Sequence, residues 1–295
     1  MIYCEGDMMQ IRTVTAKRIL TPQKRGFLTE GVYPYTHSLA WAAGCGFGST
    51  YCGTYCYAQT LPNWLYNRQP DEAWGEALII KENAPELLDA ELAKARKRQT
   101  YRIFMSSITD PYQPLERRYR LTRRCLEVFA RYDDLDLLVI QTRSPFAVDD
   151  LDLMAAIPYV YLSMTIETDR GDLPYGPNSA FLHGRYAAVQ AAVQAGVKTQ
   201  IVVSPCLPHT DGFADWLVDS GAHRFVVDTF IDGDGSRGER TAKLPFAAQS
   251  GYDWRDSDPA HRLMAALEAR GAVTGWSVDG FAAIPPRTHI SPMFR

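Results

Sequence analysis

The stretch GCGFGSTYCGTYCYA, residues 44–58, places Cys45, Cys52 and Cys56 in a C-x6-C-x3-C pattern. Three is an unusual number, because a structural zinc takes four ligands and disulfides use cysteines in pairs. The N-terminal residues lack the apolar core of a secretory signal. We therefore expect a cytoplasmic, reducing setting, in which clustered cysteines are more often metal ligands or catalysts than disulfides.

Several interpretations of this loop are open. A tetrahedral zinc would need a fourth ligand from His37, His209 or water. A [4Fe–4S] cluster held by only three thiolates would keep one iron open to a substrate or cofactor, and the glycines of the loop would let backbone N–H groups approach its sulfides. A plain electron-transfer cluster and three merely buried cysteines are the other interpretations. The pattern favours the cluster with an open iron.

Outside the loop, short β-rich apolar runs alternate with amphipathic stretches. Predicted strands cover residues 37–43, 101–106, 135–142, 159–165, 199–204 and 224–230, with a further candidate at 274–281. Predicted helices cover residues 85–99, 115–132, 149–157, 180–195, 213–220 and 259–270. The alternation indicates about six parallel β/α units, which suit an open sheet or a partial barrel. We predict an α/β fold, a partial (β/α)6 TIM-like barrel at 35–232, with an N-terminal extension at 1–34 and a C-terminal segment at 233–295.

Composition limits the partners of the chain. The formal net charge is −3, so binding to nucleic acid would need a local basic patch. The basic segments at 94–98 and 115–124 are more typical of solvated helix faces. No apolar run reaches eighteen residues, which argues against a membrane span. The stretch DGDGSRG, residues 232–238, departs from a calcium loop at Arg237 and Lys243, and we interpret it as a mobile loop or lid.

The loop and the segments after it resemble the spore photoproduct lyase-like family of radical S-adenosylmethionine (SAM) enzymes, also labelled DNA repair photolyase-like. The resemblance covers about residues 35–230. Besides the cysteines and the CYA ending, it rests on SSITDPYQPLERRYRLTRRCLE (106–127), IQTRSPFAVDDLDLM (140–154), YLSMTIETD (161–169) and AVQAGVKTQIVVSPCLP (192–208). The usual spacing in that superfamily is C-x3-C-x2-C, so the loop here is longer.

The resemblance implies that the three cysteines bind three irons of a [4Fe–4S] cluster and that SAM binds the fourth. An electron from a donor such as flavodoxin or ferredoxin would then cleave SAM to methionine and a 5′-deoxyadenosyl radical, which abstracts hydrogen from a substrate. The resemblance also places further residues near the cofactors: Ser107, Arg143 and Ser163 near the amino, carboxylate or ribose groups of SAM, and Tyr55 and Tyr57 beside the cluster and adenine.

One departure from the family pattern concerns the reaction. The lyase that names the family returns hydrogen from a cysteine at the end of its second strand, and that position falls at or near Ser107 here. A serine O–H bond is too strong to replace a thiol in this role. Cys206, after the fifth predicted strand, is the alternative thiol: a hydrogen donor, a site of substrate attachment, or a packed core residue.

The sequence thus predicts a radical SAM enzyme with an unidentified substrate, whose subclass (lyase, isomerase or transferase) stays open. The alternatives are a DNA photoproduct repair lyase proper, and a non-catalytic zinc or iron–sulfur module that binds nucleic acid through its basic helices.

Overall fold

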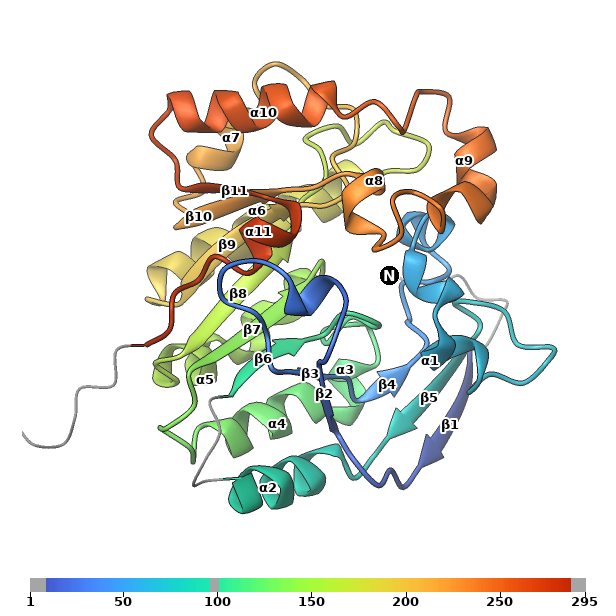
Figure 1. Cartoon of the computed structure of the whole chain (residues 1–295), viewed down its shortest axis with the longest axis vertical. Helices are drawn as coiled ribbons and strands as arrows, with labels where there is room; N and C mark the ends of the chain where they lie inside the picture. The colour runs from blue at the N-terminus through green and yellow to red at the C-terminus, as the bar shows by residue number, and fades with distance from the viewer. Residues whose placement is uncertain (1–8, 96–100, 288–295) are drawn as a thin grey trace, which may run out of the picture.

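The computed structural model describes residues 9–95 and 101–287 of the chain and has a mixed α/β fold (Figure 1). Its main sheet has eight strands in the order β11-β10-β9-β8-β7-β6-β3-β2. Each neighbouring pair in it is parallel except β2 with β3. The strands of this sheet are β2 (Leu20–Pro22), β3 (His37–Leu39), β6 (Arg102–Met105), β7 (Leu137–Thr142), β8 (Val160–Thr165), β9 (Lys198–Val203), β10 (Arg224–Val227) and β11 (Thr274–Trp276).

Helices connect the parallel strands, as the sequence pattern predicts. The longest is α6, which packs against β8 and β9, while α10 packs against β10 and β11. The α-helices are α1 (Pro62–Leu65), α2 (Ala84–Ala95), α3 (Glu116–Tyr119), α4 (Leu121–Phe129), α5 (Leu151–Ala156), α6 (Ser179–Gln194), α7 (Phe213–Val218), α8 (Phe230–Gly233), α9 (Pro245–Gln249), α10 (Asp258–Ala269) and α11 (Ser277–Phe281). Short 3-10 helices are η1 (Phe27–Thr29), η2 (Tyr51–Thr54), η3 (Tyr57–Thr60), η4 (Pro145–Asp150) and η5 (Thr241–Lys243). No described helix is long and apolar enough to span a bilayer.

Both faces of the central strands are buried, which explains their nearly continuous apolar runs. In β7, Leu138 and Ile140 belong to one large hydrophobic cluster, whereas Leu137 and Val139 belong to a second, smaller one. The smaller cluster also contains Phe281, so the C-terminal part of the chain covers one face of the sheet.

Polar side chains of the sheet bind backbone carbonyl groups of this C-terminal part. Arg224 donates to the carbonyl oxygen of Gly280 at 2.7 Å, and Arg102 donates to that of Ile284 at 2.5 Å. The Tyr35 hydroxyl donates to the carbonyl oxygen of Phe281 at 2.9 Å. These bonds satisfy buried groups that would otherwise be costly.

A second, three-stranded sheet was not predicted. It consists of β1 (Gln10–Val14), β5 (Ala77–Lys81) and β4 (Ala42–Ala43), in the order β1-β5-β4. Strand β1 runs parallel to β5, and β4 runs antiparallel to it. Residues 9–34 therefore pair with the core through β1 and β2, while the domain boundaries at 34 and 232 stay a prediction.

Four predicted elements differ from the structure. The predicted strand at 37–43 is divided into β3 and β4, which belong to different sheets. The predicted helix at 115–132 is broken between α3 and α4, because Arg120 adopts a left-handed conformation with φ of 53°. The run at 274–281 is β11 followed by α11, and the stretch at 149–157 begins inside η4. Cys4 and residues 96–99, the end of the predicted helix at 85–99, lie outside the described residues.

Candidate active site

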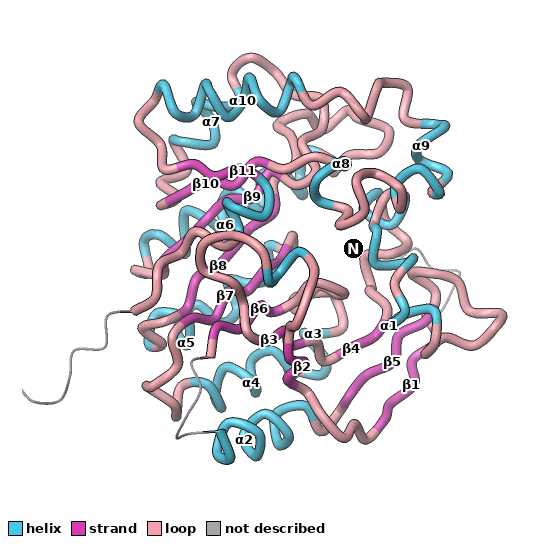
Figure 2. The backbone as a smooth tube through the Cα atoms, in the orientation of Figure 1, coloured by secondary structure: helices cyan, strands magenta, loops and turns pink. Residues whose placement is uncertain are grey.

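A cavity of about 420 Å³ lies beyond the carboxyl ends of the parallel strands, where ligands bind in such folds. Besides the strand ends and residues near η1, its lining includes two parts of the chain that are distant in sequence: the segment between β4 and α1, and the segment from the end of β10 to η5. Figure 2 shows both as loops and short helices on the same side of the main sheet. Seven of the nine predicted site residues line this cavity: Cys45, Cys52, Tyr55, Cys56, Tyr57, Ser107 and Arg143.

The cysteine loop is shaped by close backbone approaches that only glycine permits. A Cβ on Gly53 would lie 1.7 Å from the carbonyl oxygen of Gly48, and one on Gly48 would lie 2.6 Å from the Cα of Gly75. Two short 3-10 helices, η2 and η3, then carry Cys52 at the start of one turn and Cys56 just before the next. The glycines thus allow compact turns that place all three thiols on one wall.

The segment TDPYQP at 109–114 supports this loop. Gln113 accepts a hydrogen bond from the Gly46 N–H at 2.6 Å, and the Thr109 hydroxyl donates to the Gly44 carbonyl at 2.7 Å. The buried Asp110 accepts the Thr142 hydroxyl at 2.6 Å and the Arg143 N–H at 2.8 Å. These contacts tie the segment to the cysteine loop and to the end of β7 beside Arg143.

The three thiols differ in their acidity. Hydrogen bonding between Cys52 and Cys56 lowers the pKa of Cys52 and raises that of Cys56. Burial raises the pKa of Cys45 to about 12. Cys52 is therefore the thiol that the surroundings hold most readily as a thiolate, the form that binds metals.

The donor set fits a cluster better than a single ion. Within residues 9–95 and 101–287, no three His, Cys, Asp or Glu side chains are grouped to hold one metal ion. In a [4Fe–4S] cluster each thiolate instead binds a different iron, so the cysteines need only face a common space. The three cysteines meet that requirement by lining the same cavity. His37 and His209 are not among its lining residues.

Glu167 joins the cysteine loop to Arg143, and the sequence analysis did not identify it. This fully buried side chain lies just beyond β8, with one carboxylate oxygen 2.6 Å from Arg185 Nη1 and the other 3.3 Å from Arg143 Nη1. The hydroxyl groups of Tyr51 and Tyr55 lie 3.5 and 3.4 Å from the same carboxylate. Burial opposes ionisation of Glu167, but the two guanidinium groups outweigh it and lower its pKa.

Arg143 itself retains donor capacity toward the cavity. Its side chain is 19% exposed, and its Nη1 lies near Glu167 without forming a well-aligned hydrogen bond. Burial disfavours its charge, yet Cys52 and Glu167 raise its pKa well above the usual value. Arg143 is therefore a permanent cation between the thiols and a buried carboxylate, suited to bind an anionic group such as a carboxylate.

Two serines at the end of β6 also line the cavity. The carbonyl oxygen of Ser107 accepts the Tyr57 hydroxyl at 2.7 Å, which ties Tyr57 to this wall. The buried hydroxyl of Ser106 has no hydrogen-bond partner within the described part of the chain. A buried hydroxyl without a partner is costly, so Ser106 offers a donor or acceptor to a ligand in the cavity.

Two predicted site residues do not line the cavity. Ser163, fully buried within β8, donates to Gln141 at 2.5 Å and accepts from Gln200 at 2.7 Å. Cys206 is half-buried and packs against the large hydrophobic cluster, and burial raises its pKa to about 12. Thr165, two residues after Ser163 on the same face of the strand, does line the cavity.

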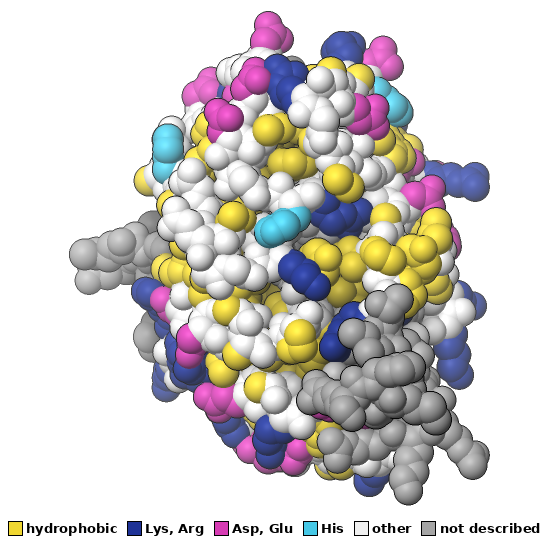
Figure 3. Space-filling model, turned by 90° about the vertical axis from the view of Figure 1, so that its left-hand side faces the viewer, with side chains coloured by type: hydrophobic (Ala, Val, Ile, Leu, Met, Phe, Trp, Pro, Cys, Tyr) yellow, Lys and Arg dark blue, Asp and Glu magenta, His cyan; other side chains and the backbone are white. Residues whose placement is uncertain are grey.

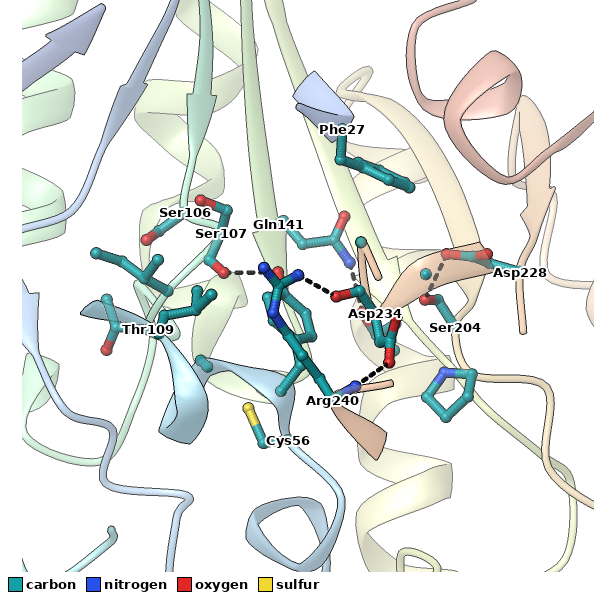
Figure 4. Close-up of a pocket in the computed structure, with 18 of the residues that line it drawn as sticks. Phe27, Cys56, Ser106, Ser107, Thr109, Gln141, Ser204, Asp228, Asp234 and Arg240 are labelled. Atoms are coloured by element: carbon teal, nitrogen blue, oxygen red, sulfur yellow. Dashed lines mark hydrogen bonds between the residues drawn. The ribbon is translucent and has the colours of Figure 1, made fainter. Parts of the chain in front are cut away.

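The wall facing the cysteine loop carries further polar groups that were not predicted. Asp228 follows β10 and accepts the Ser204 hydroxyl at 3.2 Å and the Thr229 N–H at 2.9 Å. Burial raises the pKa of Asp228 to about 7. Asp234 and Arg240 also line the cavity, and Figure 4 shows Asp234, Ser204 and Asp228 on the side opposite Ser107, with the Arg240 side chain between.

Comparison with curated proteins gives one informative relative. No protein-family model matches the chain. An uncharacterized protein of Methanocaldococcus jannaschii is 30% identical over 166 residues, which cover 55% of this chain and 58% of that protein. The match thus spans less than two thirds of that relative.

Several solved structures are similar in fold. A spore photoproduct lyase complexed with dinucleoside spore photoproduct has a TM-score of 0.58 and 14% identity, over 90% of this chain and 82% of that chain. A variant with bound AdoMet and the same dinucleoside has a TM-score of 0.53 and 16% identity, over 85% and 79%. A Cys-to-Ser variant has a TM-score of 0.51 and 15% identity, over 74% of this chain and 61% of that chain. The chain therefore has the fold of spore photoproduct lyase.

Proposed function

We propose that the protein is a radical SAM enzyme of the spore photoproduct lyase-like family, acting on an unidentified substrate. The observation that carries the proposal is the cavity wall that brings together Cys45, Cys52, Cys56 and the cation Arg143, in a chain with this fold. When bound, a reduced [4Fe–4S] cluster and SAM supply a 5′-deoxyadenosyl radical that abstracts hydrogen from a substrate. We also retain the prediction that the parallel strands form a partial (β/α)6 TIM-like barrel.

The residues of this chain would bind and orient the cofactors. The three cysteines would hold the cluster, and Arg143 would bind the SAM carboxylate, with Glu167 fixing its orientation. Tyr55 and Tyr57 would cover the cluster and exclude water, which protects reactive intermediates. Ser106 and Ser107 would offer hydrogen bonds to SAM. Because Ser163 is bonded to two glutamines and lies outside the cavity lining, we assign it a supporting role behind Gln141, which does line the cavity.

Anaerobic reconstitution tests the proposal. The wild-type chain should bind about four irons, turn brown and form 5′-deoxyadenosine from SAM with dithionite. Cys45→Ala, Cys52→Ala and Cys56→Ala should each lose iron and this activity. The control is Cys125→Ala, because Cys125 is fully buried in the hydrophobic core away from the cavity. A fully loaded wild-type protein that makes no 5′-deoxyadenosine would refute the proposal, and one zinc per chain would favour the binding module.

The role of Cys206 needs a separate test. We propose it as a hydrogen donor or substrate-attachment site only in a conformation that exposes it to the cavity, since it is not part of the lining described above. In Cys206→Ala, SAM cleavage that persists while product formation stops would support a radical relay. Unchanged SAM cleavage and product formation would assign Cys206 to the core.

DNA photoproduct repair is the second candidate function, and the fold favours it as an alternative. A solved neighbour binds dinucleoside spore photoproduct. On the face shown in Figure 3, however, basic and acidic side chains are interspersed over the described residues. Salt-sensitive binding to DNA would support this function, because phosphate contacts release counterions.

Flavodoxin or ferredoxin is our proposed electron donor. The test is to replace dithionite with the reduced donor protein in the SAM cleavage assay.

A further inference from the structure

Arg240 is a cation of the cavity that forms no ion pair with any acidic side chain of residues 9–95 and 101–287. It lines the cavity together with Cys56 and Ser107, and Figure 4 shows its side chain extending between Ser107 and Asp234. Within the described part of the chain, its guanidinium makes one hydrogen bond, from Nη1 to the carbonyl oxygen of Asp234 at 2.5 Å, and no ion pair. A guanidinium has five N–H donors, so most of its donors remain for a ligand.

The loop that carries Arg240 is organised around a buried carboxylate. Asp234 is 4% exposed and accepts N–H groups from Ser236, Gly238, Arg240 and Thr241 at 2.7 to 3.0 Å. Burial opposes its ionisation, but these hydrogen bonds lower its pKa. Backbone N–H groups therefore occupy the Asp234 carboxylate, and the Arg240 guanidinium contacts the Asp234 carbonyl oxygen and does not form an ion pair with the carboxylate.

Glycine at position 235 makes room for this arrangement. A Cβ there would lie 2.9 Å from Arg240 Nη1, and Gly235 has a φ of 65°. The guanidinium thus lies across the loop that carries it, in a position fixed by its own backbone. Because folding already orders the Arg240 side chain, less conformational entropy is lost when a ligand binds to it.

Arg240 and Arg143 make their contacts with different segments of the cavity lining. Arg143 is a leading charge in the surroundings of Cys52 and Cys56, and it faces Glu167. Arg240 instead lies against the carbonyl oxygen of Asp234, on the segment that follows β10. If Arg143 binds the single carboxylate of SAM, as proposed above, Arg240 is left for a second anion.

We propose that Arg240 anchors an anionic group of the substrate, a carboxylate or a phosphate, on the wall that faces the cysteine loop. The proposal rests on the proposed function and deepens it by naming the charge class of the substrate. The Asp234 carboxylate accepts backbone N–H groups and not the Arg240 guanidinium, and burial raises the pKa of Asp228 to about 7, which reduces its negative charge below that pH.

Titration of small anions tests the proposal on the full-length, reconstituted protein saturated with SAM. The probes are orthophosphate and acetate, whose binding is followed by calorimetry, and the tighter probe identifies the preferred group. Arg240→Gln should weaken binding about tenfold or more, because charge-assisted hydrogen bonds are lost. Arg240→Lys should keep part of the affinity. The matched control is Lys243→Gln, an equal change of charge at an exposed residue outside the cavity lining, which should leave binding unchanged.

Three results would overturn the proposal: a wild-type protein that binds neither anion, equal binding by wild type and Arg240→Gln, or equal weakening in Lys243→Gln. A raised KM for SAM in Arg240→Gln with unaltered anion binding would assign Arg240 to SAM instead. If Arg240→Gln fails to fold, the proposal is tested with Arg240→Lys. This variant should still bind the anion more weakly than the wild type, because lysine lacks the guanidinium fork. The anion titration stands apart from 5′-deoxyadenosine formation, so failure of the proposed function is recognised separately.

Discussion

Replacing Glu167 with glutamine should destabilise the protein more than most single substitutions. Glutamine keeps the shape of the side chain but removes its charge. Arg185, which is fully buried, would lose its ion-pair partner at 2.6 Å, and Arg143 would lose its partner at 3.3 Å. The glutamine amide group would also present N–H donors where the carboxylate had only acceptors.

The size of the effect follows from the burial of the cluster. Removing one partner of a buried ion pair leaves an uncompensated charge and costs roughly 3–5 kcal/mol. For a chain of this length, such a loss lowers the melting temperature by on the order of 5–10 °C. The lowered pKa of Glu167 gives the sign of the pH dependence. Its stabilisation is present above the unfolded-state pKa of about 4 and is lost as the pH falls through the lower folded-state value.

Denaturant unfolding of Glu167→Gln and wild type between pH 3 and pH 8 measures this prediction. The matched control is Asp215→Asn, which removes the acid of an exposed ion pair with Arg270 at 2.6 Å and should have a much smaller effect. The reasoning is refuted if Glu167→Gln loses no more stability than this control. Loss of iron binding should accompany the loss of stability, because Tyr51 and Tyr55 connect Glu167 to the cysteine loop.

Three further predictions concern other parts of the molecule. Gly53→Ala should abolish iron retention, because its Cβ would lie 1.7 Å from the Gly48 carbonyl oxygen. The control is Gly212→Ala, whose Cβ would have its nearest neighbour atom at 3.7 Å. Equal iron contents in the two variants would contradict the prediction. Asp228→Asn should flatten the pH dependence of the unfolding free energy between about pH 4 and 7. Burial raises the Asp228 pKa to about 7, so the wild type loses up to about 4 kcal/mol across that window as the pH rises; an unchanged slope in denaturant titrations would contradict this. Tyr35→Phe should cost about 1–3 kcal/mol in thermal unfolding, because it leaves the buried Phe281 carbonyl without its donor; a loss within the error of the measurement would count against this explanation.

The sequence predicts the parallel strands well because their burial on two faces leaves continuous apolar runs. The predicted strand at 135–142 differs from β7 by two residues at one end. The three-stranded sheet was missed because β1 pairs with β5 across more than sixty residues, a contact that no local pattern indicates. The break at Arg120 was also missed, since an arginine with positive φ has no local sequence signal.

The candidate site likewise contains residues that the sequence indicates and residues that it does not. The cysteines could be predicted because one short loop carries all three, and Arg143 because it follows a strand end. Glu167 was missed because its partners, Arg143 and Arg185, lie 24 and 18 positions away in sequence. The DGDGSRG stretch did contain a usable signal: an aspartate followed by glycine and serine forms turns through its own carboxylate, as Asp234 does here.

The hydrogen bonds from Arg102, Arg224 and Tyr35 to the C-terminal carbonyl groups affect the order in which the chain folds while it is being synthesised. Strands β3 and β6 to β10 leave the ribosome before residues 280–284. Arg102 and Arg224 of the nascent sheet can then reach Asp136 and Gln200, but each still lacks its C-terminal carbonyl acceptor. Burying a guanidinium N–H group without its acceptor costs free energy, so such a group opposes desolvation. We therefore expect this face of the sheet to stay partly hydrated until residues 280–284 arrive, and a ribosome-stalled chain ending near residue 272 should be digested by protease more readily than the complete chain.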